Sequence, residues 1–120
     1  MKRDMEIVRG MLLEFASGEG RTSFNTVIEE DKVYIYHLKI MREAGLIDYK
    51  ESGYKGGMVL LDIPTLTWFG NDYLDTVANE SVWSRTKAGL KEKGFELSGV
   101  PFQVLKDYAA FQLKQFMGIE

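Results

Sequence analysis

The chain has 120 residues, of which 45% are hydrophobic and 12% aromatic, so it is long and apolar enough to bury the core of one domain. With 15 Lys and Arg against 18 Asp and Glu, its formal net charge is −3, which counts against a non-specific nucleic-acid binder, because such proteins are usually basic. It contains no cysteine, which excludes disulfides, cysteine ligands and cysteine nucleophiles.

The first predicted elements are an amphipathic helix over residues 4–17 and a short strand. Apolar residues such as Met5, Val8 and Met11 recur at helical intervals until "SGEG" ends the pattern. In the stretch Thr22–Ile28, Phe24 alternates with polar neighbours and three β-branched residues follow, which predicts a strand.

A second helix is predicted over residues 31–45, with Gly45 as its end. The acidic run Glu29, Glu30 and Asp31 stands at its start. We interpret these carboxylates as stabilising the positive end of the helix dipole, with a magnesium site as the alternative.

This helix carries the only histidine of the chain, His37. Its position on the helical wheel is in the middle of the apolar face, beside Val33 and Met41. A metal ligand would need partners, and the sequence has no second histidine and no cysteine to complete a metal site. We therefore predict a buried, structural histidine that is hydrogen-bonded to the backbone or to a tyrosine.

A β-hairpin and three helices are predicted for the rest of the chain. "IDYKES" and "MVLLDI" are the predicted strands of the hairpin, with a turn at "GYKGG" between them. Thr67 is the predicted N-cap of the first of these helices. The second is predicted to begin at Asn79 or Ser81 and to stop at Gly94, and the third to run from Pro101 to about Met117. "FELSG", before the last helix, is a predicted loop.

This order predicts an α+β fold, and it resembles a winged helix. The resemblance rests on "YHLKIMREAGLI", on the hairpin with its glycine-rich tip, and on "LTWFGNDYLD" directly after it. Together with "MKRDMEIVRGMLLEF", "VW" and "VPFQVLK", these stretches look like the bacterial and phage family catalogued as domain of unknown function 2513. The resemblance implies one winged-helix-like domain over residues 1–120, with a C-terminal helical extension from about residue 80. It departs from a regular helix-turn-helix because a strand precedes the recognition-like helix.

Around the second helix and the hairpin the local charge is positive. Residues 32–55 hold five basic side chains and three acidic ones. In a major groove, Lys and Arg reach phosphates or guanine, and an aliphatic side chain contacts a thymine methyl. The candidate nucleic-acid-binding residues are Lys32, Ile35, Lys39 and Arg42 on the helix face opposite His37, and Lys50, Tyr54 and Lys55 on the wing. The alternative is a solvated helix face.

The last helix has an apolar arc of roughly 200°, wider than the stripe of about 100° that packs on a single core. We predict that Val104, Tyr108 and Phe111 form a homodimer interface on this arc. The alternative is a helix that is buried between two elements of its own chain.

Enzyme motifs are absent from the sequence: it has no P-loop, no dinucleotide fingerprint and no nucleophile elbow. We expect no enzymatic activity, no catalytic residue, no metal and no cofactor. No apolar run approaches the roughly 20 residues of a membrane span, and charged residues interrupt the apolar N-terminal stretch that a signal peptide would need. We therefore expect a cytoplasmic protein without a membrane partner.

Two functions are compatible with these patterns. The first is a transcriptional regulator that binds double-stranded DNA through the helix face and the wing. The alternative is a winged-helix interaction module that binds a protein partner without DNA. The net charge of −3 favours the protein partner, whereas the local positive charge and Ile35 favour DNA.

Overall fold

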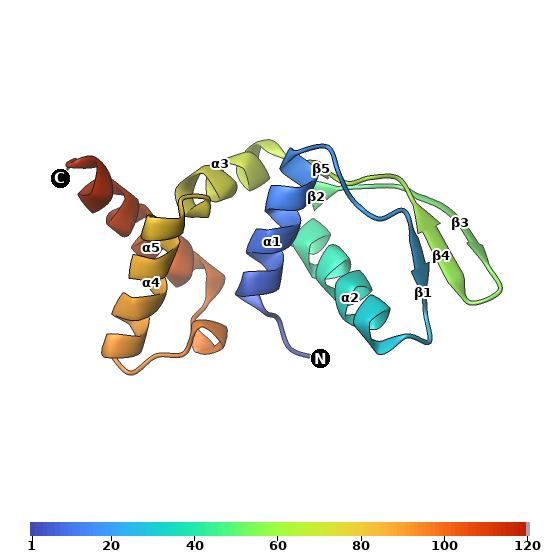
Figure 1. Ribbon diagram of the computed structural model, residues 1–120, viewed down its shortest axis with the longest axis horizontal. Coiled ribbons are helices and arrows are strands. Elements are labelled where there is room, and N and C mark those ends of the chain that lie inside the picture. Colours follow the sequence, from blue (N-terminus) through green and yellow to red (C-terminus); the bar gives the residue numbers. More distant parts are fainter. Residues whose placement is uncertain (120) are drawn as a thin grey trace. The chain divides into compact units, whose positions relative to one another are not determined.

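The computed structural model describes residues 1–119, except the side chains of Tyr54 and Lys55 (Figure 1). The helices are α1 (Met5–Ala16), α2 (Glu29–Glu43), α3 (Trp68–Val77), α4 (Glu80–Glu92) and α5 (Phe102–Met117), with a short 3₁₀-helix at Leu97–Gly99. The strands are β1 (Ser23–Asn25), β2 (Ile47–Asp48), β3 (Glu51–Lys55), β4 (Met58–Leu61) and β5 (Thr65–Leu66). The fold is α+β and ends in helices, as the sequence predicts.

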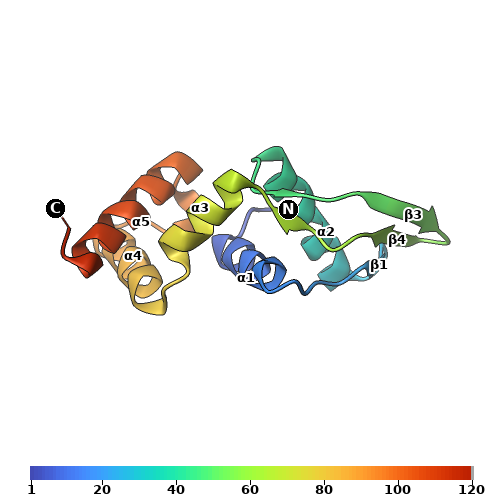
Figure 2. The ribbon, with the colours of Figure 1, turned by 90° about the horizontal axis from the view of Figure 1, so that it is seen from above.

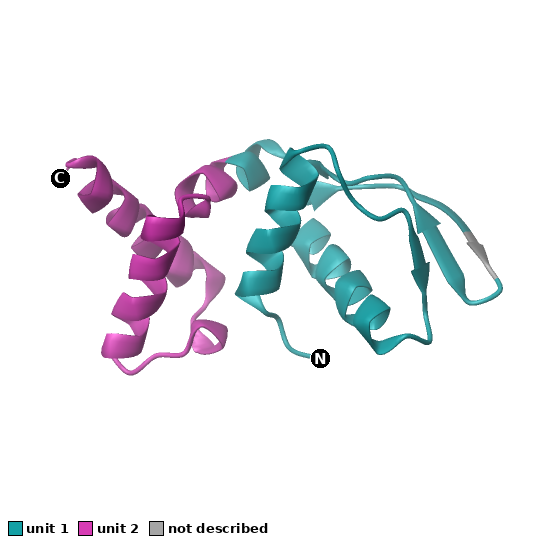
Figure 3. Cartoon of the chain, in the orientation of Figure 1, with its two compact units in different colours: residues 1–71 teal, residues 72–120 magenta. Residues whose placement is uncertain are grey.

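The chain forms two compact units, which we call unit 1 (residues 1–71) and unit 2 (residues 72–120) (Figure 3). Unit 1 contains α1, α2 and the strands β1 to β5, and unit 2 contains α4 and α5. The boundary falls within α3. A single domain over residues 1–120 stays a prediction.

The first helix, α1, follows its sequence prediction closely. Asp4 is the N-cap, and its carboxylate accepts hydrogen bonds from the backbone N–H groups of Glu6 and Ile7 at 2.9 and 3.4 Å. Its buried apolar residues are Met5, Val8, Met11, Leu12 and Phe15. These are the positions that the helical spacing marks in the sequence.

The second helix, α2, begins two residues before its predicted start, so the three acidic residues form its first turn. At its end, Gly45 N–H donates to the Arg42 carbonyl and Leu46 N–H donates to the Met41 carbonyl, at 3.0 and 2.9 Å. This pair of bonds is a Schellman motif, which requires the left-handed conformation that Gly45 adopts with φ +78°. The glycine in "EAGLI" therefore ends the helix because it can adopt the left-handed conformation.

The strands form two antiparallel sheets rather than one hairpin. β4 lies between β1 and β3, and β2 pairs separately with β5 (Figures 1 and 2). The predicted strand "IDYKES" is thus divided between two sheets. The predicted five-residue turn is too long, because only Gly56 and Gly57, with φ +58° and +80°, turn the chain, as in a type I′ turn. β1 is also shorter than the predicted strand Thr22–Ile28.

In unit 2, α4 and α5 pack against each other. Asn79 caps α4, as predicted, by accepting hydrogen bonds from the N–H groups of Ser81 and Val82 at 2.9 and 3.1 Å. A Cβ at Gly89 would overlap the Tyr108 hydroxyl group, so this glycine permits the close approach of the two helices. The buried residues of the pair are Val82, Trp83, Thr86 and Leu90 on α4 and Leu105 and Ala109 on α5. The predicted loop "FELSG" contains the 3₁₀-helix.

Candidate nucleic-acid interface

The outer face of α2 carries the basic residues that the sequence predicts there. Lys39 is exposed, and Lys32 is exposed with its Nζ 3.6 Å from a carboxylate oxygen of Glu29, one turn earlier. Such a surface ion pair contributes little stability and leaves the lysine free to exchange partners. Ile35, between the two lysines, is half-buried, so its predicted exposure is only partly right.

Arg42, at the end of α2, has a partner that sequence reasoning missed. The centre of its guanidinium group lies 4.1 Å from the centroid of the Tyr49 ring, and Nη1 donates to the Tyr49 carbonyl at 3.3 Å. Burial raises the pKa of the Tyr49 hydroxyl, and Arg42 opposes this shift. The predicted DNA-contacting arginine therefore stabilises the chain reversal after α2.

The β3–β4 hairpin, which is the predicted wing, is preceded by one described basic residue, Lys50, which is exposed between β2 and β3. The side chains of Tyr54 and Lys55 lie outside the described residues. The tip of the wing is attached to the segment before α2, because the backbone N–H and the hydroxyl of Thr26 both donate to the Gly57 carbonyl, at 2.8 and 2.7 Å. The tip of the hairpin is thus held beside the segment that leads into α2.

Behind this surface, an ion pair holds β1 against α2. Arg21 donates to both carboxylate oxygens of Asp31, at 2.8 and 3.0 Å, and Asp31 also accepts from the Asn25 N–H at 2.7 Å. These charge-assisted bonds stabilise the ionised form, so Arg21 and the Asn25 N–H hold the pKa of Asp31 below its usual range. Asp31 therefore attaches β1 to α2. In the order of elements, β1 takes the place that a supporting helix has in a regular helix-turn-helix.

An aromatic pair completes the attachment of β1. The rings of Phe24 and Tyr34 stack with centroids 5.0 Å apart, and the Arg21 guanidinium lies 4.6 Å from the Phe24 centroid. Tyr34 donates its hydroxyl proton to Glu14 at 2.6 Å. Burial and this bond to Glu14 together raise the pKa of the Tyr34 hydroxyl. Sequence reasoning missed the whole cluster, since its members come from α1, α2 and the β1 segment.

His37 is buried and structural, as predicted. Its Nε2 accepts a hydrogen bond from the Asp4 N–H at 2.9 Å, and its Nδ1 lies 2.8 Å from the Val33 carbonyl oxygen. Because a backbone N–H can only donate, Nε2 carries no proton and Nδ1–H is the donor to Val33. His37 thus joins the N-cap residue of α1 to α2.

A junction of three residues connects the end of α2 to the start of α3. The Thr67 hydroxyl donates to the Gly45 carbonyl and accepts from the Gly70 N–H at 2.9 Å. Thr67 therefore caps the N-terminus of α3, as predicted. A Cβ at Gly70 would overlap the carbonyl oxygen of Leu46. The threonine and the glycine of "LTWFG" are therefore needed where α3 contacts the Schellman turn at the end of α2.

On α5, the three residues of the predicted dimer interface differ in exposure. Val104 and Phe111 expose 52% and 51% of their surface, and Tyr108 is half-buried. Val104 and Phe111 therefore leave apolar surface exposed on α5, whereas the Tyr108 hydroxyl lies against Gly89 of α4. In the described part of the chain, no helix combines the length and apolarity needed to cross a membrane.

Comparison with known proteins finds one family and one curated relative. The family described as "Hypothetical protein (DUF2513)" matches residues 2–96. An "Uncharacterized protein" of Haemophilus influenzae is 31% identical over 107 residues, which are 82% of this chain and 86% of that protein. No solved structure matches the chain. The family match covers the whole of unit 1 and ends before α5.

Proposed function

Since this chain belongs to the family described as "Hypothetical protein (DUF2513)", and that description names no activity, we propose a function from the geometry of unit 1. Unit 1 is a winged-helix module that binds double-stranded DNA as part of a transcriptional regulator. Its order of helix, strand, helix and hairpin supports the winged-helix reading. In this arrangement α2 enters the major groove and the wing contacts the neighbouring backbone.

The observation that carries this proposal is the alignment of Lys32, Ile35 and Lys39 along the outer face of α2. The two lysines lie seven residues, or about 10 Å, apart along the helix. Their ammonium groups can contact phosphates, and Ile35 is apolar enough to contact a thymine methyl. Lys50 adds positive charge at the base of the wing. Arg42 has a lesser part in the proposed contact, because Tyr49 holds its guanidinium group.

The test is binding of the full chain to a random duplex across a salt series that begins at about 50 mM. We expect detectable binding at the low end and a salt slope that falls in magnitude by about 0.9 in Lys39→Gln, because one phosphate contact is lost. Lys91→Gln removes the same charge from an exposed position on α4 and is the matched control. No binding by wild type at 50 mM, or equal effects of the two variants, would overturn the proposal.

A second candidate function is supported by a different observation. Val27 and Ile28, directly before α2, expose 75% and 46% of their surface. Two neighbouring aliphatic residues at the point where a recognition helix would meet DNA favour contact with a protein. In that case the paired substitution Val27→Ser with Ile28→Ser would weaken the protein complex, and DNA binding by the wild type would be absent at low salt.

We also propose that the chain is a homodimer through α5. The exposed Val104 and Phe111 support this arrangement, because two apolar helix faces bury each other when they pair. A twofold dimer would also present two copies of α2, as dimeric DNA-binding proteins do at paired half-sites.

A further inference from the structure

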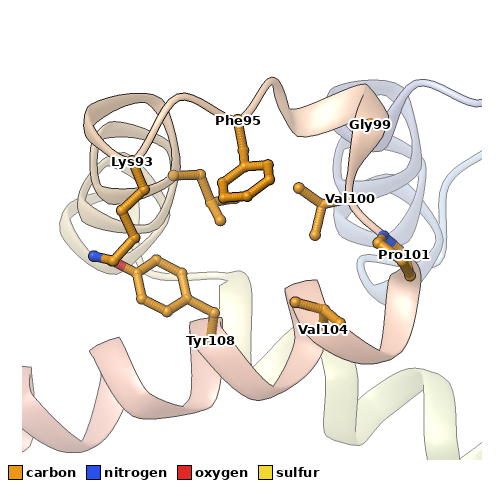
Figure 4. Close-up of a pocket in the computed structure, with 8 residues that line it drawn as sticks. Lys93, Phe95, Gly99, Val100, Pro101, Val104 and Tyr108 are labelled. Carbon is orange, nitrogen blue, oxygen red and sulfur yellow. The ribbon is translucent and has the colours of Figure 1, made fainter.

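Unit 2 contains a pocket of about 240 Å³ that the proposed DNA contact does not use (Figure 4). It lies between the end of α4, the segment with the 3₁₀-helix, and the first turns of α5. Its apolar walls are formed by Leu90, Phe95, Val100, Pro101 and Val104. Protein interiors have few voids larger than a water molecule, so a pocket of this size exceeds ordinary packing defects.

The volume limits what the pocket can hold. An apolar cavity of about 150 Å³ is large enough to bind benzene. The present pocket is larger and open to solvent through the exposed Phe95 and Val104. It therefore accommodates one six-membered ring with a short substituent that reaches the opening.

Two polar groups mark one end of this otherwise apolar site. In Figure 4, Lys93 and Tyr108 lie together at the end opposite Pro101, and the Lys93 Nζ is 5.4 Å from the centroid of the Tyr108 ring. The Tyr108 hydroxyl oxygen accepts a hydrogen bond from Gln112 at 3.0 Å, which leaves its own proton as a donor. None of the lining residues is acidic. The wall of the pocket itself is almost entirely apolar, so these two polar groups lie at its rim. A ligand that reaches this rim from the pocket meets a cation and a hydrogen-bond donor, which suit a carboxylate.

We propose that the pocket is a binding site for a small aromatic monocarboxylate. The ring lies among Leu90, Val100 and Val104, and the carboxylate meets the Lys93 ammonium group beside the Tyr108 hydroxyl. The site lies entirely within unit 2. It is therefore independent of the DNA proposal, and either can fail without the other. It shares Val104 and Tyr108 with the proposed dimer interface, so the pocket and that interface are neighbouring surfaces of α5.

The experiment is a calorimetric titration of the full chain with three probes of similar shape: benzoate, benzyl alcohol and benzylamine. We expect benzoate to bind best and benzylamine worst, because the three probes share a benzene ring and carry a negative, a neutral and a positive polar group, respectively. Lys93→Gln should weaken benzoate binding about 2- to 5-fold, the range of a partly exposed ion pair, and leave benzyl alcohol unchanged. Lys91→Gln removes a lysine that does not line the pocket and should change neither.

A second variant tests the location of the site. Val104→Phe places a ring in the pocket and should abolish binding of both benzoate and benzyl alcohol, and the exposed position of Val104 allows the variant to fold. Gln115→Phe adds the same ring at an exposed position of α5 outside the pocket and should leave both affinities unchanged. No binding of benzoate at about 10 mM, an affinity independent of probe charge, or equal loss in both phenylalanine variants would overturn the proposal.

Discussion

His37 is a single side chain that holds two helices together. Its ring accepts a hydrogen bond from the N-cap residue of α1 and donates one to a carbonyl within α2. The imidazole side of both bonds is shielded from solvent, because His37 has no exposed surface. A buried group with two satisfied hydrogen bonds contributes to stability mainly through the cost of leaving either partner unpaired.

We therefore predict that His37→Gln lowers the free energy of unfolding by about 1–3 kcal/mol, because a glutamine amide cannot meet Asp4 N–H and the Val33 carbonyl in the same geometry. Urea unfolding measures the change. The folded fraction should keep any DNA affinity of the wild type, since His37 lies on the buried side of α2. A variant as stable as wild type would contradict the structural role.

Asp31 gives a prediction that depends on pH. Its pKa is lower in the folded state than in the unfolded chain, so the folded state binds fewer protons and stability rises with pH through this range. The stabilisation is complete above the unfolded pKa of about 4 and is lost as pH falls through the folded value. Asp31→Asn should therefore be less stable than wild type at neutral pH, and the difference should shrink below pH 4.

Urea unfolding of both proteins at neutral and acidic pH tests this expectation. Glu30→Gln is the control, because Glu30 is an exposed carboxylate in the same helical turn. It should show little difference from wild type at either pH. A gap between Asp31→Asn and wild type that stays constant as the pH falls would show that Asp31 does not act through its charge.

At the scale of elements, the junction between α2 and α3 depends on the absence of a side chain. The helix α3 approaches the carbonyl of Leu46 so closely that a Cβ at Gly70 would overlap it. The obstacle is backbone, which cannot rotate away as a flexible side chain can. The Thr67 cap fixes the same approach through its bond to Gly45.

Gly70→Ala should thus lower the free energy of unfolding by more than about 2 kcal/mol, despite the higher helix propensity of alanine. Gly10→Ala in α1 is the matched control, because its Cβ would meet no atom. It should raise stability by about 0.5–1 kcal/mol. Equal thermal unfolding curves for the two alanine variants would refute the close contact at Gly70.

At the scale of the whole molecule, the proposed assembly is a homodimer. Sedimentation equilibrium at tens of micromolar should give a mass near twice 13.7 kDa. Phe111→Ser should shift the equilibrium to monomer while keeping the fold, because Phe111 is half exposed. Leu13→Ser, at an exposed site on α1, should leave the dimer intact. A monomeric wild type would rule out the α5 interface.

The sequence by itself determined the helices and most of their ends. Helical spacing of apolar residues identified α1, α2 and α4, and local signals marked where they stop, such as Gly45 and Gly94. The Asn79 and Thr67 caps were also predictable, because a cap acts on N–H groups only two or three residues away. Burial of His37 followed from the same periodicity.

Only the tertiary structure decided which residues meet across the chain. The Arg21 pair with Asp31 spans ten residues, and the His37 bond to Asp4 spans 33. The division of the predicted hairpin between two sheets likewise depends on β5, because β2 pairs with β5 whereas β3 pairs with β4. No local pattern encodes such contacts, since they depend on the three-dimensional course of the intervening chain. Arg42 is a further example, because the periodicity placed it on the candidate nucleic-acid-binding face, and in the structure Tyr49 holds its guanidinium group at the end of the helix.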